Sequence, residues 1–489
     1  MQREEDTICA IASGLGSAAI GIIRVSGRDA IKTVDKIFVT PSKKRVADMK
    51  SFTAAYGYIV DPEGESAGTS ENKNAVTSKN FGSLKKIDEV IVLVMKAPST
   101  YTTEDCVEID CHGGSFVMKK IVDLLAKMGI RPADPGEFTK RAFLGGRIDM
   151  TEAEAVMDVI NAENDMALST SLSQLSGKLK DKITAMRETI LHETAFIEAA
   201  LDDPEHYSLD GYTYKLESAV KEIRGKIKSL ADSFDDGRMI REGIRTAIVG
   251  RPNVGKSSVL NMMLGQERAI VTDVAGTTRD TLEEYMNLGN TMLKLIDTAG
   301  IRNTEDTVEK IGVKKAEETI ERADLILFII DGTEALTEYD REIAARLTHK
   351  TVICLINKMD KGNVVTEDDV KNILMDNRKE ESEKVSIISI SAHNKTGLDE
   401  LKNNIEEMFF SGKVSYNDQI YITNSRQKAC LIRADEALER VQDTIAEGME
   451  EDLYTIDLLD AYESLGNIIG ETLEDDLADK IFKDFCMGK

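Results

Sequence analysis

Short apolar runs alternate with polar segments in the first part of the chain. Ile20–Val25 and Val90–Met95 have the length and the apolar content typical of buried strands, and Pro98 follows the second run. Between them, Asp61–Gly82 is rich in Gly, Ser, Glu, Asn and Thr and poor in apolar residues, so we expect a surface loop there. The pattern predicts an α+β domain over residues 1–120.

Two later regions, residues 121–238 and 412–489, carry apolar residues at helical spacing, which predicts long helices that bury one face. The stripes of the first region are Leu168, Leu172, Leu175 and Leu179, then Ile183, Met186, Ile190 and Ile197. Those of the second are Leu431, Ala434, Leu438, Val441 and Ile445, then Leu458, Tyr462, Leu465 and Ile469. Because neither region alone would bury its stripes well, we interpret them as one discontinuous helical domain.

Residues 243–410 have a third pattern, in which apolar strands alternate with amphipathic stretches. This alternation is typical of a doubly wound parallel sheet, inserted here into the helical domain. The expected strands are Thr246–Val249, Leu293–Ile296, Leu325–Ile330, Val352–Ile356 and Ser386–Ile390.

Length and composition agree with a multidomain protein of α/β and α domains. The chain has 489 residues, 42% of them hydrophobic and 30% charged, which excludes global disorder and favours two to four domains of about 100–200 residues each. The net charge of −25 argues against a surface that binds a phosphate backbone throughout. The six cysteines have no paired spacing, so we expect reduced thiols. With no signal peptide and no long apolar run, we expect a cytosolic protein and no membrane partner.

A phosphate-binding loop lies between the first strand of the third region and a helical stretch. Its sequence is Gly250-Arg-Pro-Asn-Val-Gly-Lys-Ser257. In such a loop the glycines let backbone N–H groups close on the phosphates, Lys256 reaches the β and γ oxygens, and the Ser257 hydroxyl binds Mg²⁺.

Further motifs follow in the order of a GTPase. Asp297-Thr-Ala-Gly300 ends a strand and would hold the magnesium shell and the γ-phosphate, and Thr278 would complete the magnesium sphere. Asn357-Lys-Met-Asp360 ends another strand, and the Asp360 carboxylate can accept hydrogen bonds from guanine N1–H and its exocyclic amine. A backbone amide in Ser391-Ala392-His393 can meet the guanine oxygen. We therefore predict a Ras-like GTPase domain.

The residue that orients the attacking water in many GTPases is absent from its usual place. Ile301 follows the Asp-x-x-Gly turn, where a glutamine is common, and its side chain cannot orient water. Asn253 in the P-loop could supply an oxygen to a monovalent cation that replaces an arginine finger. The alternative is that Asn253 only makes a turn.

With these motifs the chain resembles the MnmE (TrmE) family of tRNA modification GTPases over nearly its whole length. The resemblance rests on Gly250–Ser258, Thr272–Asp280, Asp297–Gly300, Asn357–Asp360, Pro135–Phe143 and Phe485–Lys489. It implies a potassium-dependent GTPase that modifies C5 of the wobble uridine, position 34, of certain tRNAs with an aminomethyl or carboxymethylaminomethyl group. It also implies a homodimer, a partner of the MnmG type that uses flavin and NADH in a heterotetramer, and a tetrahydrofolate (5,10-methylene or 5-formyl) as the one-carbon source.

The resemblance also assigns roles to residues. Potassium would be bound by Asn253, the carbonyls of Thr272 and Val274, and Thr277, while Ser257 and Thr278 bind magnesium. Glu309 would orient the hydrolytic water indirectly, beside the catalytic Lys256 and Thr278. Arg24, Glu108, Arg147 and Lys489 match the folate-binding positions. The GTP-binding residues expected are Asn253, Val254, Gly255, Lys256, Ser257, Ser258, Thr272, Asp273, Val274, Ala275, Gly276, Thr277, Thr278, Asp297, Thr298, Ala299, Gly300, Asn357, Lys358, Met359, Asp360, Ser391, Ala392 and His393.

Cysteines raise two further hypotheses. Cys106, Cys111 and His112 invite a metal site, but on a strand the two thiols point to opposite faces, which favours ordinary buried cysteines. Cys486 stands four residues from the end, yet Gly488-Lys489 and the acidic segment before it do not suit prenylation. Cys486 is either catalytic or a small residue beside the folate, and the sequence leaves both open.

The end of the chain is expected to be ordered. Ile481, Phe482 and Phe485 are spaced to bury one helical face, so we predict that the last five residues dock at the folate site. The alternative function is a GTP-dependent switch in ribosome assembly. That alternative gives no role to Pro135–Phe143, and the acidic tail lacks the basic appendage expected for RNA binding.

Overall fold

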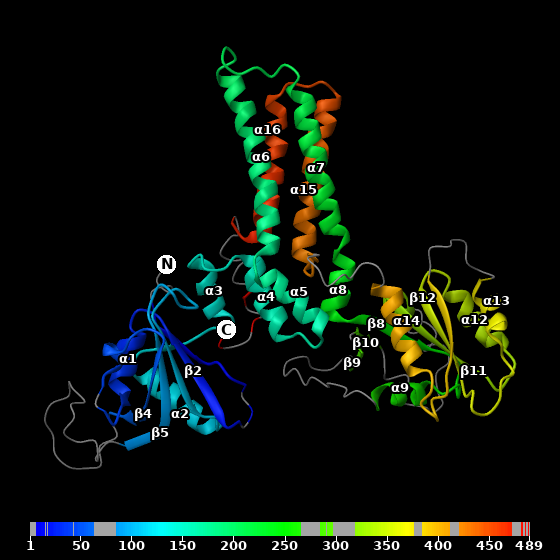
Figure 1. The fold of residues 1–489 in the computed structure, drawn as a ribbon, viewed down its shortest axis with the longest axis horizontal. Coiled ribbons are helices and arrows are strands. Elements are labelled where there is room, and N and C mark those ends of the chain that lie inside the picture. The colour runs from blue at the N-terminus through cyan, green and yellow to red at the C-terminus, as the bar shows by residue number, and fades with distance from the viewer. Residues whose placement is uncertain are drawn as a thin grey trace. The chain divides into compact units, whose positions relative to one another are not determined.

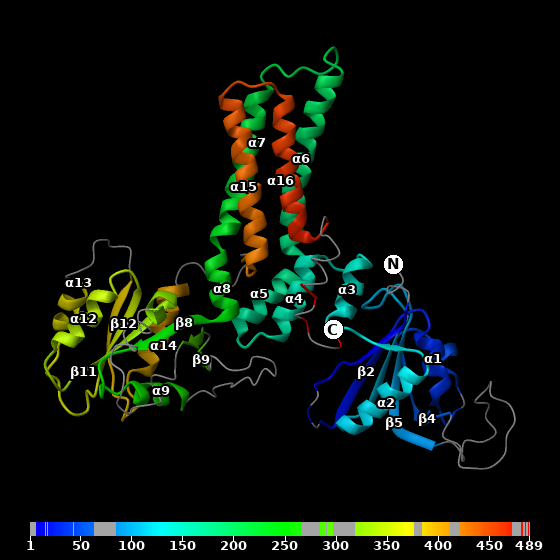
Figure 2. The same cartoon turned by 180° about the vertical axis from the view of Figure 1, so that it is seen from behind.

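A computed structural model describes the chain in two compact units, residues 1–157 with 469–489 and residues 158–468. Figures 1 and 2 show the elements of each unit. The described residues are 6–14, 16, 18–42, 44–62, 85–265, 284–289, 291–296, 318–375, 384–410, 420–471, 481–482, 485 and 488. The expected loop Asp61–Gly82 lies almost entirely outside them. The predicted domain boundaries stay predictions.

The first unit contains a sheet in the order β3-β4-β5-β6-β2-β1-β7, antiparallel except where β7 pairs with β1. Apolar residues of α1 and α2 cover one face of it. The N-terminal α+β domain is confirmed. The elements of the first unit are β1 (Ile8–Ile11), β2 (Ile20–Ser26), α1 (Ala30–Ile37), β3 (Phe38–Val39), β4 (Thr53–Asp61), β5 (Lys85–Met95), β6 (Cys106–His112), α2 (Ser115–Lys127), β7 (Arg131–Pro132), α3 (Glu137–Leu144) and the larger part of α4 (Met150–Ile160), whose last residues belong to the second unit.

The C-terminal residues pack within this first unit. Phe482 and Phe485 are buried with Met150 and Ala153 in one apolar cluster. Gly488 lies so close to the backbone of β1 that a Cβ atom there would come within 2.4 Å of the Ile11 carbonyl oxygen. The described part of the tail is therefore docked, as the spacing of its aromatic residues predicted.

The long helices of the second unit are α6, α7, α15 and α16, which lie side by side in both views (Figures 1 and 2). Residues from both sequence regions build them, so the discontinuous helical domain is confirmed. The helices of this domain are α5 (Asp165–Leu175), α6 (Lys178–Asp202), α7 (Tyr212–Asp232), α8 (Phe234–Glu242), α15 (Ser425–Ala446) and α16 (Asp452–Ile469).

Most residues of the expected stripes are buried or half-buried, but two are exposed. Ile183, Ile190, Leu431 and Leu438 lie in the interior, whereas Leu168 and Leu172 are 38% and 48% exposed. Helix α5 instead buries Ala167, Ser171 and Gln174, and the Gln174 side chain donates to the Tyr421 carbonyl at 2.7 Å. The expected burial of Leu168 and Leu172 was wrong because helical spacing shows which residues share a face and not which face is buried, and α5 buries the face of Ala167, Ser171 and Gln174.

The rest of the second unit is a twisted sheet in the order β13-β12-β11-β8-β10-β9. Helices α9 and α14 cover one face, and α12 and α13 the other. The Ras-like arrangement is confirmed, with one edge strand, β9, that runs antiparallel to β10 and that the sequence did not reveal. The elements are β8 (Ile244–Val249), α9 (Lys256–Leu264), β9 (Glu284–Leu288), β10 (Thr291–Leu295), β11 (Leu325–Asp331), α12 (Glu338–Arg346), β12 (Thr351–Asn357), α13 (Glu367–Met375), β13 (Val385–Ser389) and α14 (Leu398–Phe410).

None of the helices in the described residues combines the length and the apolar character needed to cross a membrane.

Two glycines with the same backbone angle allow a test of tail docking. Gly136 and Gly146 both have φ of +69°, but a Cβ at Gly136 would come within 2.5 Å of the Phe482 carbonyl oxygen, whereas one at Gly146 would meet nothing within 4 Å. Alanine at either position carries a left-handed penalty of about 1 kcal/mol. We expect only Gly136→Ala to release the tail, with amide hydrogen exchange at Phe482 and Phe485 faster by about tenfold or more. Equal exchange in the two variants would contradict the docking.

Candidate functional site

The P-loop connects β8 to α9 and depends on glycine where it approaches β12. Gly255 has φ of +101°, and a Cβ there would come within 2.4 Å of the Asn357 amide nitrogen. Gly255 is also the residue before the first turn of α9. The first N–H groups of a helix have no partner within the helix and favour an anion. The loop and the helix start therefore form a phosphate-binding geometry.

Lys256 lies across this loop. Its ammonium donates to the carbonyl oxygens of Gly250 at 2.7 Å and Arg251 at 2.9 Å. Burial lowers the pKa of Lys256 from its ordinary value, because removal from water disfavours the charged form. A phosphate nearby would favour the charged form again, so the charge of Lys256 would be stabilised when an anion binds in the loop.

Asn357 ties the guanine motif to the P-loop. Its side-chain amide donates to the Val254 carbonyl at 2.9 Å, and its side-chain oxygen accepts from the Ala392 N–H at 3.1 Å. The residue is buried at the end of β12. One side chain thus joins the ends of three expected motifs, which lie far apart in the sequence.

Asp360 and Ser391 form the part of the site expected to recognise the base. The Ser391 hydroxyl donates to Asp360 Oδ1 at 2.6 Å. This bond lowers the pKa of the Asp360 carboxyl, so the group stays ionised at neutral pH and can accept hydrogen bonds. His393 lies beside them, exposed, with its ring contacting the Asn394 side chain at 3.0 Å.

Several predicted residues of this site lie outside the described part of the chain. The structure places Asn253 to Ser258 in the P-loop and the start of α9, and Asn357 to Asp360 at the end of β12. Their expected Mg²⁺, K⁺ and water-orienting partners stay predictions. Outside the described residues lie Thr272, Asp273, Val274, Ala275, Gly276, Thr277, Thr278, Asp297, Thr298, Ala299, Gly300 and Glu309, with Cys486 and Lys489 of the tail.

A second polar site lies on the face of the first unit's sheet that α1 and α2 leave uncovered. Arg24 on β2 and Glu108 on β6 are directly opposite in the antiparallel register. The Arg24 guanidinium donates to Glu108 Oε1 through Nε at 2.9 Å and Nη2 at 2.8 Å. Arg24 Nη1 also reaches the Gly488 carbonyl at 3.4 Å. The docked tail and the two predicted folate residues therefore meet at one place.

The third predicted residue, Arg147, approaches the same place through an aromatic ring. Its guanidinium carbon lies 5.0 Å from the ring centre of Tyr101, and that of Arg24 lies 5.7 Å from the same ring. Arg24 is also 5.7 Å from the ring of Phe138, which is fully buried. Arginines at these distances are attracted to aromatic rings. Both guanidinium groups therefore lie near the Tyr101 ring.

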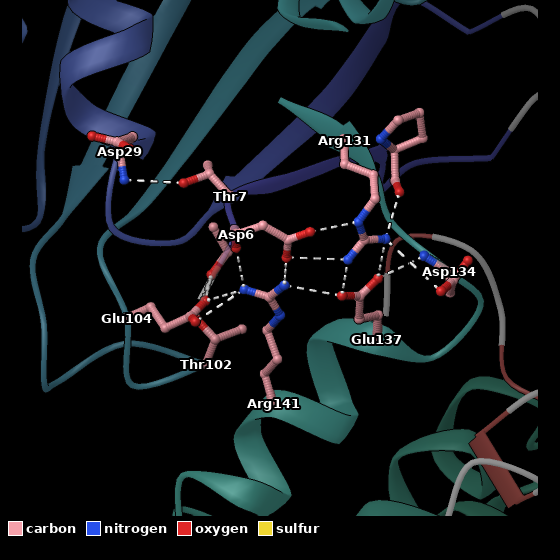
Figure 3. A network of polar contacts seen from close by, with 11 residues as sticks. Asp6, Thr7, Asp29, Thr102, Glu104, Arg131, Asp134, Glu137 and Arg141 are labelled. Atoms are coloured by element: carbon pink, nitrogen blue, oxygen red, sulfur yellow. Dashed lines mark hydrogen bonds and ion pairs between the residues drawn. The ribbon is translucent and has the colours of Figure 1, made fainter. Parts of the chain in front are cut away.

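An ion-pair network fixes α3 beside this second site (Figure 3). The buried Arg141 pairs with Asp6 at 2.9 Å, Glu104 at 3.0 Å and Glu137 at 3.0 Å. Arg131 pairs with Glu137 at 2.6 Å. Burial would raise the pKa of Glu137, but the two arginines lower it below its ordinary value. Since Arg141 and Glu137 are buried, removal of one partner would leave an unpaired buried charge, which is costly.

The network gives the segment Pro135–Phe143 a structural role. Its members Glu137 and Arg141 make the ion pairs, Phe138 lies beside Arg24, and the Thr139 hydroxyl is 3.0 Å from that of Tyr101. The segment therefore connects the sheet to the second polar site.

Two residues near the sites were missed in the sequence. Tyr101 lies in the loop before β6, and Asp331 ends β11. A polar residue directly after a buried parallel strand is a signal that could have found Asp331, because such strand ends line the binding edge of α/β sheets. Tyr101 has no comparable signal, since its role depends on arginines that the fold brings to it.

The cysteine hypothesis for a metal is not supported. Cys106 and Cys111 are buried on β6, and burial raises the pKa of the Cys111 thiol to about 11. Among the described residues, no group of His, Cys, Asp and Glu side chains is arranged to hold a metal ion. Both thiols are buried, and that of Cys111 donates to the Gly21 carbonyl at 3.3 Å.

Comparisons with known proteins match nearly the whole chain. A family model described as "MnmE helical domain" matches residues 150–486, and one described as "GTP-binding protein TrmE N-terminus" matches residues 7–147. Similar proteins named "tRNA modification GTPase MnmE" come from Lachnoclostridium phytofermentans, 49% identical, and Thermoanaerobacter pseudethanolicus, 45% identical, each over 99% of both chains. One from Geobacillus kaustophilus is 42% identical over 99% of this chain and 100% of its own.

Base recognition by Asp360 can be tested with an amide. Asp360→Asn should weaken GTP binding by about 100-fold, because the amide cannot accept both guanine N–H bonds. It should bind xanthosine triphosphate better than GTP, because xanthine offers a carbonyl where guanine has an amine. Equilibrium binding of GTP, xanthosine triphosphate and ATP to both proteins measures this. Tight ATP binding by the unchanged protein would refute the assignment of the base.

Proposed function

The chain belongs to the MnmE family of tRNA modification GTPases, and we propose that it couples GTP hydrolysis to modification of the wobble uridine of certain tRNAs. Membership makes it a GTPase that acts in tRNA modification. One observation carries the proposal about the wobble uridine. The chain has both a P-loop site and a second polar site built around Arg24 and Arg147, and it aligns with its relatives over 99% of both chains. Because the chain belongs to this family, a role in tRNA modification replaces the alternative of a GTP-dependent switch in ribosome assembly.

For hydrolysis, we assign the phosphates to the P-loop and Lys256. Ser257 and Thr278 would bind magnesium, and Asn253 would bind potassium with the carbonyls of Thr272 and Val274 and with Thr277. Asn253 has a left-handed backbone, with φ of +66°, a conformation that asparagine tolerates better than most residues. Potassium would supply positive charge near the developing phosphate charge, and Glu309 would orient the water indirectly.

A reduced folate fits the second polar site by the chemistry of its side chains. The Glu108 carboxylate can accept from the pterin N–H groups, while Arg24, Arg147 and Lys489 can bind carboxylates of the glutamyl tail. Arg24 and Glu108 keep 16% and 19% of their side-chain surface exposed, so a ligand can reach both. When bound, the folate would supply the one-carbon unit. Its form, 5,10-methylene or 5-formyl, and any role of Cys486 belong to the same proposal.

The proposed assembly is a homodimer that joins a flavin- and NADH-using partner of the MnmG type in a heterotetramer and acts on tRNA. Large apolar side chains on the sheet of the first unit support an interface, since Tyr56 and Ile91 are 48% and 46% exposed. The negative net charge of −25 restricts tRNA binding to a local surface.

Potassium activation is tested by comparing salts. GTP hydrolysis should be about tenfold faster or more in K⁺ than in Na⁺ at equal ionic strength, because only the larger ion fits the proposed oxygen cage. Asn253→Ala should remove the difference between the salts. Equal rates of GTP hydrolysis in both salts for the unchanged protein would contradict potassium activation.

Folate use is tested with two carboxylates on one strand. Glu108→Ala should weaken binding of 5-formyltetrahydrofolate by about tenfold or more, since it removes a charge-assisted partner, and should abolish tRNA modification while GTP hydrolysis continues. Asp110→Ala is the matched control, because Asp110 lies two residues along β6. Calorimetry and a reconstituted modification assay measure both effects. No folate binding by the unchanged chain, or the same loss in both variants, would count against the site.

A further inference from the structure

A buried aspartate outside every motif named above contacts the lysine of the guanine motif. Asp331 is the last residue of β11 and is 4% exposed. Its Oδ2 accepts from Lys358 Nζ at 2.6 Å. Its Oδ1 accepts from the Thr333 N–H at 3.0 Å and the Thr333 hydroxyl at 2.7 Å. Both carboxylate oxygens are engaged, so the side chain has one well-defined position.

Lys358 extends this contact to the P-loop. Besides its bond to Asp331, its ammonium donates to the Asn253 carbonyl oxygen at 2.8 Å. Lys358 and Asn253 both have left-handed backbones, each with φ of +66°, which cost energy unless neighbouring groups hold them. The chain of contacts therefore runs from the end of β11 through one ammonium to a strained turn of the P-loop.

The charges favour this arrangement. Burial alone would raise the pKa of Asp331, but the bonds from Lys358 and Thr333 outweigh burial and lower it. Asp331 is therefore ionised at neutral pH and faces an ammonium. A charge-assisted bond of this length is stronger than one between neutral groups. Without it, the flexible lysine would have to be ordered when the nucleotide binds, which weakens affinity.

We propose that Asp331 is a positioning residue of the GTPase site, which fixes Lys358 and, through it, the backbone of the P-loop at Asn253. Asp331 itself need not touch the nucleotide. The contact is made to the backbone carbonyl of Asn253 and not to the side chain proposed for potassium, so GTP and GDP should depend on it equally. Affinity should change more than the turnover of bound GTP.

The direct test is Asp331→Asn in the full chain, since asparagine keeps an oxygen for Thr333 but loses the charge. Binding of GTP and GDP carrying a methylanthraniloyl fluorophore should weaken by about tenfold for both. KM for GTP should rise in step while kcat stays within about twofold. Unchanged affinity would overturn the proposal, and so would a loss confined to kcat.

The matched control is Asp324→Asn, at the opposite end of the same strand. Asp324 makes a comparable ion pair, to Arg238 Nη2 at 2.8 Å, but lies before the first residue of β11. The affinity of the Asp324→Asn variant for both nucleotides should stay within about twofold of that of the unchanged protein. An equal loss in this variant would mean that breaking an ion pair at either end of β11 weakens the domain, which contradicts a positioning role.

A double-mutant cycle separates positioning from general stability. Lys358→Met should weaken binding, and adding Asp331→Asn to it should cost less than about twofold more, because Asp331 acts through the lysine. A full tenfold further loss would overturn the proposal. Should Asp331→Asn fail to fold, Thr333→Val removes one bond to the same carboxylate. It should weaken both nucleotides by about threefold, and unchanged affinity there would count against the proposal.

Discussion

The docking of the last described residues against the first domain is the constraint on which the rest of the structure depends. Phe482 and Phe485 are buried with Met150 and Ala153, and Gly488 packs against the backbone of β1. Residues 158–468 are consequently an insertion that leaves the first unit and returns to it. Within the second unit, α15 and α16 lie beside α6 and α7, and apolar residues of all four helices are buried. The GTPase domain is inserted in turn between α8 and α15.

The same constraint shapes the second polar site. Arg24 reaches the Gly488 carbonyl, and Arg147 follows α3, which the buried charges of Arg141 and Glu137 hold against the sheet. Breaking one partner of such a network leaves an unpaired buried charge, which commonly costs about 3–5 kcal/mol. The site thus combines residues from widely separated parts of the sequence, and it is complete only when the tail has docked.

Much of the fold could be predicted from the sequence because apolar periodicity reports burial. The parallel strands around the P-loop and most helical stripes follow it. The antiparallel edge strand β9 did not stand out, since in Glu284–Leu288 the buried face includes a glutamate. Leu168 and Leu172 have helical spacing but face outward, because spacing fixes which residues share a face and not which face is buried. At the sites, motifs identified the residues expected to bind a nucleotide, whereas Tyr101 and Asp331 contact other side chains of the sites and belong to no motif.

The central claim is that this chain serves tRNA modification through GTP hydrolysis, and the wobble nucleoside itself tests it most directly. Mass spectrometry of nucleosides from tRNA of cells that lack this chain should find uridine without its C5 aminomethyl-type group at position 34. Expression of the unchanged chain should restore the modification, and expression of a chain carrying Lys256→Ala, which lacks the P-loop ammonium, should not. Normal amounts of the modified nucleoside in cells without the chain would contradict the account.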